Sequence, residues 1–299
     1  MSVSDPAVTI IIPTLGLRER AASLQTAIES GLAQTGVRPT VIVVLNGARW
    51  ASEVERSLRE DRRVTLLVRE GRGLPAALAA GRAVVQTPWF TALDDDDFLL
   101  PGALELRVRA LEECAECAAV ITNGFRRNGF ADELHVKPGN RVQGDPIREM
   151  LLGNWFLPGS WLCRTELVGT DVFEEMPSFL ECTYLALRIA TEHPVVWRDT
   201  PTVVYSVGSP AAESLSRAYV LGQVNGLRRI IALNLPEDVR RALRSRIAGA
   251  YHAASDHERM SGALFAAWRW HVASLVQPSG WRYLPFTRHL LRDAVRLRS

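Results

Sequence analysis

Short β-branched runs alternate with helical segments through the amino-terminal third of the chain, and this alternation constrains the fold more than any other feature. Apolar runs at residues 8–14 and 40–45 are typical of buried parallel strands. Between them, residues 18–32 carry apolar side chains at helical spacing, and Gly36 and Pro39 follow this helix. Such a βαβ unit predicts a mostly parallel sheet that is flanked by helices on both faces.

The pattern repeats before the sequence turns acidic. A third strand candidate at residues 64–68 is followed by Gly71-Arg72-Gly73 and by an alanine-rich helix over residues 74–85, which leads to the apolar run at residues 89–93. Ligands of parallel sheets bind beyond the carboxyl ends of the strands. The polar segments at these ends are Pro13-Thr14, Asn46-Gly47, Gly71-Arg72-Gly73 and the acidic residues 94–97. We therefore expect a ligand site where these segments converge.

Four consecutive aspartates, Asp94 to Asp97, follow the fourth apolar run. Neighbouring carboxylates repel one another and raise one another's pKa unless positive charge compensates them. Carboxylate oxygens suit Mg2+ or Mn2+, which keep coordination sites free for phosphate oxygens. A solvated acidic turn or a helix cap is the alternative interpretation. The sequence contains neither the dinucleotide-binding pattern G-x-G-x-x-G after its first strand nor the P-loop pattern G-x-x-x-x-G-K-[ST]. Without these phosphate-binding loops, a metal ion is the favoured means of holding a phosphate group.

The chain resembles the family 2 glycosyltransferases of the GT-A fold. The first strand matches at residues 8–14 and the metal loop at residues 93–97. Further matches follow in the family's order at Ala33-Gln34-Thr35, Gly73-x-x-x-Ala77-x-x-x-Gly81, Leu100 to Glu105, Asn154 to Arg164 and Phe173 to Arg188. The resemblance implies an α/β fold of GT-A type with a Rossmann-like nucleotide-binding half, and we expect a helical C-terminal extension beyond it.

The resemblance also implies an activity and a donor site. Family members transfer a sugar from a nucleotide diphosphate donor to an acceptor hydroxyl, with inversion at the anomeric carbon, which suggests polysaccharide or glycoconjugate synthesis. Mn2+ or Mg2+ would be held by Asp96 with help from Asp94, and would stabilise the charge on the leaving diphosphate. The residues that we expect to bind the donor are Pro13, Thr14, Leu15, Arg18, Asn46, Arg72, Gly73, Asp94, Asp95 and Asp96.

Glu181 is the candidate general base. The family pattern is Glu-Asp ahead of a Leu-x-Leu-Arg helix, with the aspartate as base, whereas this chain has Glu181-Cys182. A base must be mostly deprotonated at the working pH. A carboxylate with a pKa near about 4.3 meets this demand, and a thiol near about 8.5 does not. The alternative is that Glu181 caps the helix or pairs with Arg188.

Departures from the family pattern support other interpretations. Leu45, Ala79, Cys182 and Gly208 stand where the family usually has polar or ionisable residues. They favour, as the main alternative, a degenerate GT-A domain that binds nucleotide or scaffolds an assembly without turnover. A sugar nucleotidyltransferase shares the architecture but usually has a basic, glycine-rich loop near the first strand. This chain has only Leu15-Gly16-Leu17-Arg18 there, which counts against that alternative. A glycoside hydrolase would need neither nucleotide nor metal, so chelation would distinguish it.

The C-terminal region differs in charge from the rest of the chain. Residues 218–299 hold thirteen arginines and five acidic residues, a net charge of +8, whereas the whole chain carries +2. Aromatic residues alternate there with arginines, as in helices that lie on membranes. We consider peripheral membrane contact through these helices, with a saccharide or lipid-linked acceptor, alongside simple packing of the aromatics onto the catalytic domain. Nucleic acid is not an expected partner, because the catalytic half is acidic.

We expect three regions along the chain. Residues 1–110 would form the nucleotide-sugar-binding half of the GT-A domain, residues 111–217 its acceptor-side half, and residues 218–299 a helical C-terminal region. No apolar stretch reaches the roughly eighteen residues of a membrane span, and no signal precedes the first strand. These features predict a cytoplasmic protein, peripheral on the inner face of the membrane if the helices bind it. The four cysteines are then expected as unpaired thiols.

Overall fold

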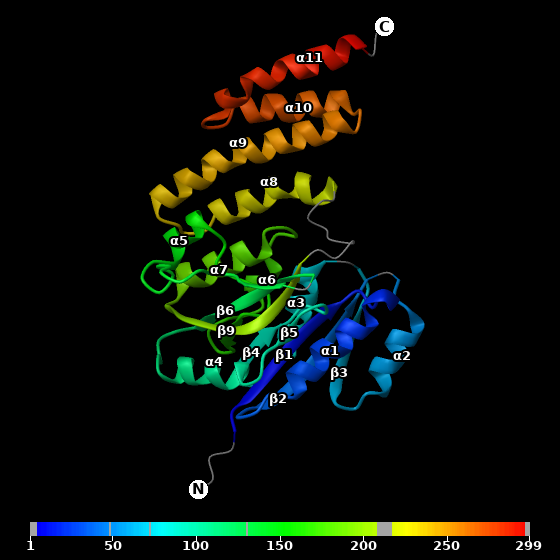
Figure 1. The fold of residues 1–299 in the computed structure, drawn as a ribbon, viewed down its shortest axis with the longest axis vertical. Coiled ribbons are helices and arrows are strands. Elements are labelled where there is room, and N and C mark those ends of the chain that lie inside the picture. The colour runs from blue at the N-terminus through cyan, green and yellow to red at the C-terminus, as the bar shows by residue number, and fades with distance from the viewer. Residues whose placement is uncertain (1–4, 48, 72, 130, 208–216, 297–299) are drawn as a thin grey trace. The chain divides into compact units, whose positions relative to one another are not determined.

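Figure 1 shows the fold in a computed structural model of the chain. The structure describes residues 5–47, 49–71, 73–129, 131–207 and 217–296. Within these ranges the chain forms two compact units. The first comprises residues up to 176 and residues 185–207, and the second comprises residues 177–184 and 217–296.

The first unit is built on one sheet, in which the described strands follow the order β3-β2-β1-β4-β8-β6-β9-β5, with β7 paired to β6. The strands are β1 (Ala7–Thr14), β2 (Arg38–Asn46), β3 (Val64–Arg69), β4 (Trp89–Ala92), β5 (Phe98–Leu99), β6 (Ala119–Asn128), β7 (Ala131–Leu134), β8 (Trp161–Arg164) and β9 (Val195–Val207). The helices are η1 (Arg18–Arg20), α1 (Ala21–Leu32), α2 (Ser52–Glu60), α3 (Leu74–Ala83), α4 (Ala103–Glu112), α5 (Pro146–Leu152), α6 (Asp171–Glu174) and α7 (Glu181–Glu192), of which α7 begins in the second unit.

Helices cover both faces of the amino-terminal half of the sheet. The neighbouring residues Ile10 and Ile11 of β1 point to opposite faces, and each meets a different helix. A Cβ atom at Gly31 of α1 would collide with Ile10, and one at Gly81 of α3 would collide with Ile11. Each glycine therefore allows its helix to approach the sheet closely. β1 pairs in parallel with β2 and β4, and β2 pairs in parallel with β3, as the alternating sequence predicts.

The sheet becomes mixed beyond β4. β8 runs antiparallel to both β4 and β6, and β5 runs antiparallel to β9, while β6 and β9 are parallel. The sheet is therefore parallel throughout only in its amino-terminal half, from β3 to β4. The predicted α/β fold class with flanking helices is confirmed.

The second unit is helical, as predicted. Its helices after α7 are α8 (Arg217–Ile231), α9 (Glu237–Met260), α10 (Leu264–Leu275), η3 (Gly280–Phe286) and α11 (Thr287–Arg296). Buried polar contacts join them. Ser274 Oγ donates to the carbonyl of Ala248 at 2.9 Å, and His271 Nε2 lies 2.8 Å from Thr287 Oγ1. Within the described ranges, no helix combines the length and apolar character needed to cross a bilayer.

One expectation about the cysteines is wrong. Cys114 and Cys117 form a disulfide, whereas Cys163 and Cys182 take no part in one. α4 ends before this pair, and Cys117 N donates to the carbonyl of Cys114 at 3.1 Å. The resulting turn brings the two side chains together.

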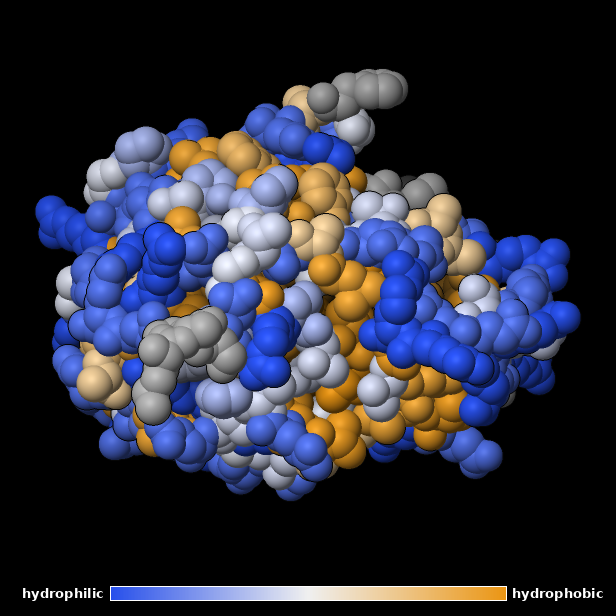
Figure 2. Space-filling model, turned by 90° about the horizontal axis from the view of Figure 1, so that it is seen from below, coloured by the Kyte–Doolittle hydropathy of each residue, from blue (hydrophilic) through white to orange (hydrophobic). Residues whose placement is uncertain are grey.

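Figure 2 shows one side of the molecule, which is mainly hydrophilic with a band of hydrophobic residues. The large apolar side chains of the first unit that are exposed belong to separate segments: Val68, Val84, Leu152 and Leu167. Apolar exposure of this kind is ordinary in globular proteins.

Candidate active site

A tight turn after β4 positions the four aspartates. Asp97 N donates to the carbonyl of Asp94 at 3.2 Å, which closes the turn. Leu93 N donates to the carbonyl of Ile11 at 2.9 Å and so extends the pairing of β4 with β1 up to the turn. The aspartates therefore lie at the carboxyl edge of the parallel strands, where such sheets bind ligands.

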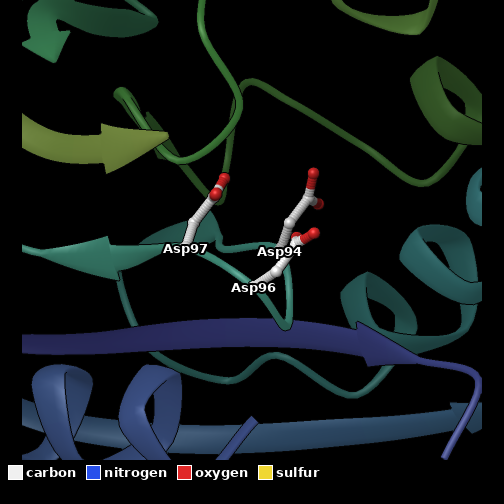
Figure 3. A group of neighbouring side chains, drawn as sticks. All are labelled: Asp94, Asp96 and Asp97. Atoms are coloured by element: carbon white, nitrogen blue, oxygen red, sulfur yellow. The ribbon is translucent and has the colours of Figure 1, made fainter. Parts of the chain in front are cut away.

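Asp94, Asp96 and Asp97 form what we call the acidic cluster. One carboxylate oxygen from each lies within 4.8 Å of the others, and the three side chains point to the same side of the turn (Figure 3). Asp97 is buried, and its Oδ1 accepts a hydrogen bond from Ser206 N at 2.9 Å. Among the described residues, its Oδ2 has no hydrogen-bond partner. A buried carboxylate oxygen left in this way is costly unless a cation meets it.

Asp95 links the turn to the loop after β1. Its Oδ2 accepts a hydrogen bond from Thr14 Oγ1 at 2.6 Å, and Thr14 Oγ1 in turn accepts one from Gly16 N at 3.0 Å. Gly16 has a φ of +64°, and a Cβ there would collide with Leu45. Only glycine therefore fits this loop well.

Arg20 is a residue of the candidate site that the sequence did not indicate. Its guanidinium donates to Asp95 Oδ1 at 2.5 Å and pairs with Asp96 Oδ2 at 3.1 Å. Burial by itself would lower the pKa of Arg20, but the charges of Asp95 and Asp96 outweigh it and raise that pKa. In the sequence Arg20 differs little from Arg18, so no local signal separates them.

The acidic cluster holds more negative charge than its surroundings neutralise. Burial, followed by the charges of Asp96 and Asp95, raises the pKa of Asp94 to about 7. Burial also raises the pKa of Asp96 against the opposing charge of Arg20. Burial and the charge of Asp94 raise the pKa of Asp97 well above its usual range. A divalent cation would relieve this repulsion, so the hard oxygen donors fit Mg2+ or Mn2+.

Asn46 joins the end of β2 to the loop before α3. Its side chain is buried, with Nδ2 donating to the carbonyl of Gly73 at 3.0 Å and Oδ1 accepting from Arg69 at 3.4 Å. β1 and β2 pair in register, with Thr14 opposite Leu45. Two of the predicted donor residues, Asn46 and Gly73, are thus in direct contact.

The other predicted donor residues occupy different environments. Pro13 is buried in β1, and Leu15 is half-buried directly after it. Arg18 is exposed and forms an ion pair with Glu53 of α2 at 2.5 Å. Arg72 lies outside the described residues.

Glu181 is the first residue of α7 and belongs to the second unit. Leu180 before it has a φ of 66°, and its carbonyl accepts a hydrogen bond from Tyr184 N at 2.8 Å. Arg188, one of the partners considered for Glu181, forms ion pairs with Asp171, Glu175 and Glu192. Gly208, which stands in place of a family histidine, lies outside the described residues.

The sequence profile described as Glycosyl transferase family 2 matches residues 9–161. This stretch is half of the chain and includes the loop after β1, the acidic cluster and Arg20. The chain belongs to glycosyl transferase family 2. Membership agrees with the resemblance drawn from the motifs.

Curated relatives of this family 2 chain include two uncharacterized glycosyltransferases from Rickettsia. The protein from Rickettsia bellii is 29% identical over 157 residues, which are 51% of this chain and 22% of the relative. The protein from Rickettsia prowazekii is 27% identical over 148 residues, which are 49% of this chain and 45% of the relative. The chain thus spans less than half the length of these relatives.

Two solved structures are similar in fold. S. aureus TarS 1-349 in complex with UDP-GlcNAc has a TM-score of 0.58 at 12% identity, covering 87% of this chain and 75% of that one. The mannosyltransferase PcManGT from Pyrobaculum calidifontis in complex with GDP-Man and Mn2+ has a TM-score of 0.56 at 17% identity, covering 98% and 87%. At these identities the likeness shows the fold alone.

Proposed function

We propose that this family 2 chain is a metal-dependent, inverting glycosyltransferase. It moves a sugar from a nucleotide diphosphate donor to the hydroxyl of a saccharide or lipid-linked acceptor, in polysaccharide or glycoconjugate synthesis. The acidic cluster carries this proposal, because its three carboxylates lie within 4.8 Å at the ligand-binding edge of the sheet. TarS with UDP-GlcNAc and PcManGT with GDP-Man and Mn2+ have the same type of fold.

Asp94 and Asp96, with Asp97 beside them, are the residues that would hold Mn2+ or Mg2+. The fit rests on the partnerless Oδ2 of Asp97 and on the raised pKa of all three carboxyls. When bound, the ion supplies a Lewis acid for the negative charge of the leaving diphosphate. Arg20 pairs with Asp96 Oδ2 at 3.1 Å and so holds that carboxylate in place.

The donor site is formed by residues at the strand ends. We assign the nucleoside to Pro13, Thr14, Leu15 and Asn46 and the diphosphate to Arg18, Arg72 and the aspartates. Gly73 has open space where a Cβ would stand, so a ligand can approach its backbone closely. Residues 1–110 would then be the donor half, residues 111–217 the acceptor half and residues 218–299 a helical region of a cytoplasmic, peripheral protein.

Glu181 is our candidate for the base that takes the acceptor's proton. Glu181 is the first residue of α7, at the position of the family's acidic pair. We expect Glu181→Gln to lower turnover by at least about 100-fold while nucleotide binding is retained. Glu192→Gln, at the other end of α7, is the matched control and should keep its turnover.

Calorimetric binding of UDP, GDP, dTDP, CDP and ADP tests the donor site. With Mn2+ present, we expect one nucleotide to bind preferentially, and binding to vanish after chelation and in Asp96→Ala. Asp132→Asn removes an exposed carboxylate that pairs with Arg127, and it should bind as the unchanged chain does. If the folded chain binds none of the five, the transferase proposal is wrong. Metal-dependent binding without turnover would favour the degenerate domain instead.

A further inference from the structure

An exposed stripe of apolar residues and arginine runs from η3 into α11. Its members are spaced three and four residues apart: Trp281, Leu284, Arg288, Leu291 and Val295. Trp281 is 75% exposed and Val295 is 68% exposed. This spacing places the α11 members on one face of the helix. The buried residue of α11 is Leu290, which anchors that helix to the unit.

A second stripe of the same kind lies on α10. Phe265, Arg269, Val272 and Val276 follow at spacings of four, three and four residues, and all four are exposed. The buried residues of α10 are Ala267, His271 and Ser274. α10 therefore packs through these residues and through half-buried side chains such as Trp270, while Phe265, Val272 and Val276 remain exposed.

The aromatic residues of this region fall into an inner and an outer set. The ring of Tyr283 stacks on that of His252 with the ring centroids 4.3 Å apart, and Phe286 meets the same imidazole edge-on with the centroids 4.7 Å apart. Trp270 packs against Tyr251 with the ring centroids 5.6 Å apart. These inner aromatics already fill the contacts between the helices, so the packing of the unit does not explain the exposure of Trp281.

Charge in this region is predominantly positive. Residues 261–299 contain six arginines and a single acidic residue, Asp293. Asp293 accepts a hydrogen bond from Arg259 of α9 at 3.0 Å, so its charge is compensated within the unit. The surface that remains is basic and apolar, with Arg269, Arg282, Arg288 and Arg292 among the exposed apolar side chains.

Exposed arginines together with exposed apolar side chains favour one class of partner over the others. A second copy meeting the same face would place arginine against arginine, which disfavours symmetric self-association. Nucleic acid would match the arginines but not the exposed Trp281, Leu284 and Leu291. An anionic lipid surface matches both, because tryptophan and leucine enter the interfacial layer while arginine meets the lipid phosphates.

We propose that the exposed stripes of α10, η3 and α11 bind the surface of an anionic membrane. The exposed residues that we assign to this binding are Phe265, Arg269, Val272, Val276, Trp281, Arg282, Leu284, Arg288, Leu291, Arg292 and Val295. Trp281 and the aliphatic residues supply the apolar contact, and the arginines supply the preference for negative lipid. This proposal does not depend on the donor chemistry proposed above.

Flotation of the full chain with vesicles tests the proposal. One set of vesicles is phosphatidylcholine, and in the other about one third is phosphatidylglycerol. We expect binding to the anionic set that weakens as salt is added. Replacing Leu284, Leu291 and Val295 by serine, or Arg282, Arg288 and Arg292 by glutamine, should lower the partition coefficient at least about tenfold.

Matched controls come from the first unit. Leu152→Ser removes an apolar side chain that is 83% exposed on α5, and Arg56→Gln removes an exposed arginine on α2. Both should bind vesicles as the unchanged chain does. Brominated lipid should also quench tryptophan fluorescence, and Trp281→Phe should remove most of that quenching. Circular dichroism checks that each variant is folded.

Two outcomes would overturn the proposal. One is that the chain does not float with anionic vesicles at low salt, or that stripe and control variants float equally. The other is that the chain binds no vesicles but dimerises, and that the triple serine variant at Leu284, Leu291 and Val295 abolishes the dimer. That result would identify a second copy as the partner. Nucleotide binding by the same variants should be unchanged, so failure here is distinguishable from failure of the proposed function.

Discussion

The two units place charge in opposite ways. In the first, Asp95 and Asp97 are buried beside Asp94 and Asp96, and burial raises the pKa of three of these carboxyls. In the second, the arginines near the C-terminus are exposed, and the buried Glu258 is paired with Arg217 at 2.7 Å. Folding alone gives little reason to bury carboxylates so close together, which supports the metal site that we propose. Exposed arginines among exposed apolar side chains support the membrane-binding surface that we propose.

Asp97→Asn should have the largest effect on the difference in buried charge between the two units. The variant keeps an acceptor for Ser206 N and removes a negative charge that faces Asp94. We expect the metal-free protein to gain about 1–3 kcal/mol of unfolding free energy and the Mn2+ affinity to fall at least about tenfold. Calorimetric unfolding in chelator and a Mn2+ titration measure the two effects. An unchanged Mn2+ affinity would remove Asp97 from the metal site.

Arg20→Ala should show how much the buried charge depends on its one observed cationic partner. The variant leaves Asp95 buried without Arg20, and we expect a loss of about 2 kcal/mol, less than for a fully buried pair because Arg20 is 29% exposed. The double variant Arg20→Ala/Asp95→Asn should recover part of this loss, because neither charge is left alone. Urea unfolding measures both. Losses that simply add would show that the pair is not coupled.

The metal-free first unit should lose stability as the pH rises. Its folded state binds the Asp94 proton more tightly than the unfolded chain does, since the pKa of Asp94 is raised to about 7. The advantage is complete below the unfolded pKa near about 3.9 and is lost as the pH passes about 7. Thermal unfolding in chelator, followed by probes in the first unit, should show a loss on the order of 4 kcal/mol between about pH 4 and pH 7. Asp94→Asn should flatten the slope, and a rise in stability with pH would contradict this assignment.

The second unit should show a smaller effect of opposite sign. Burial, and the charge of His252, lower the pKa of His271, and burial lowers that of His252 against the opposing charge of Asp256. The stability that these neutral rings provide is present above the unfolded pKa near about 6.5 and is lost as the pH falls. Hydrogen-exchange protection of α10 should therefore fall by about 1 kcal/mol on acidification. His271→Gln, which keeps a polar group near Thr287, is the control that should reduce this dependence.

Strands and helices of the amino-terminal half of the sheet were predictable because their signals are local. The apolar runs at residues 8–14, 40–45 and 64–68 correspond to β1, β2 and β3, and the helix expected over residues 74–85 corresponds to α3. Parallel strands buried on both faces need continuous apolar sequence, which is readable without a partner strand. The antiparallel insertion of β8 between β4 and β6 depends on pairing across the chain, and no local signal announces it.

The sequence by itself determined the family, the α/β alternation and the position of the acidic residues at a strand end, because each of these is written in neighbouring residues. Only the tertiary structure decided which aspartates share a cluster and that Asp95 and Asp96 pair with Arg20. It also decided which aromatics of the C-terminal helices are buried. These properties depend on the direction of side chains and on segments brought together from distant parts of the chain, and no short stretch of sequence contains that information.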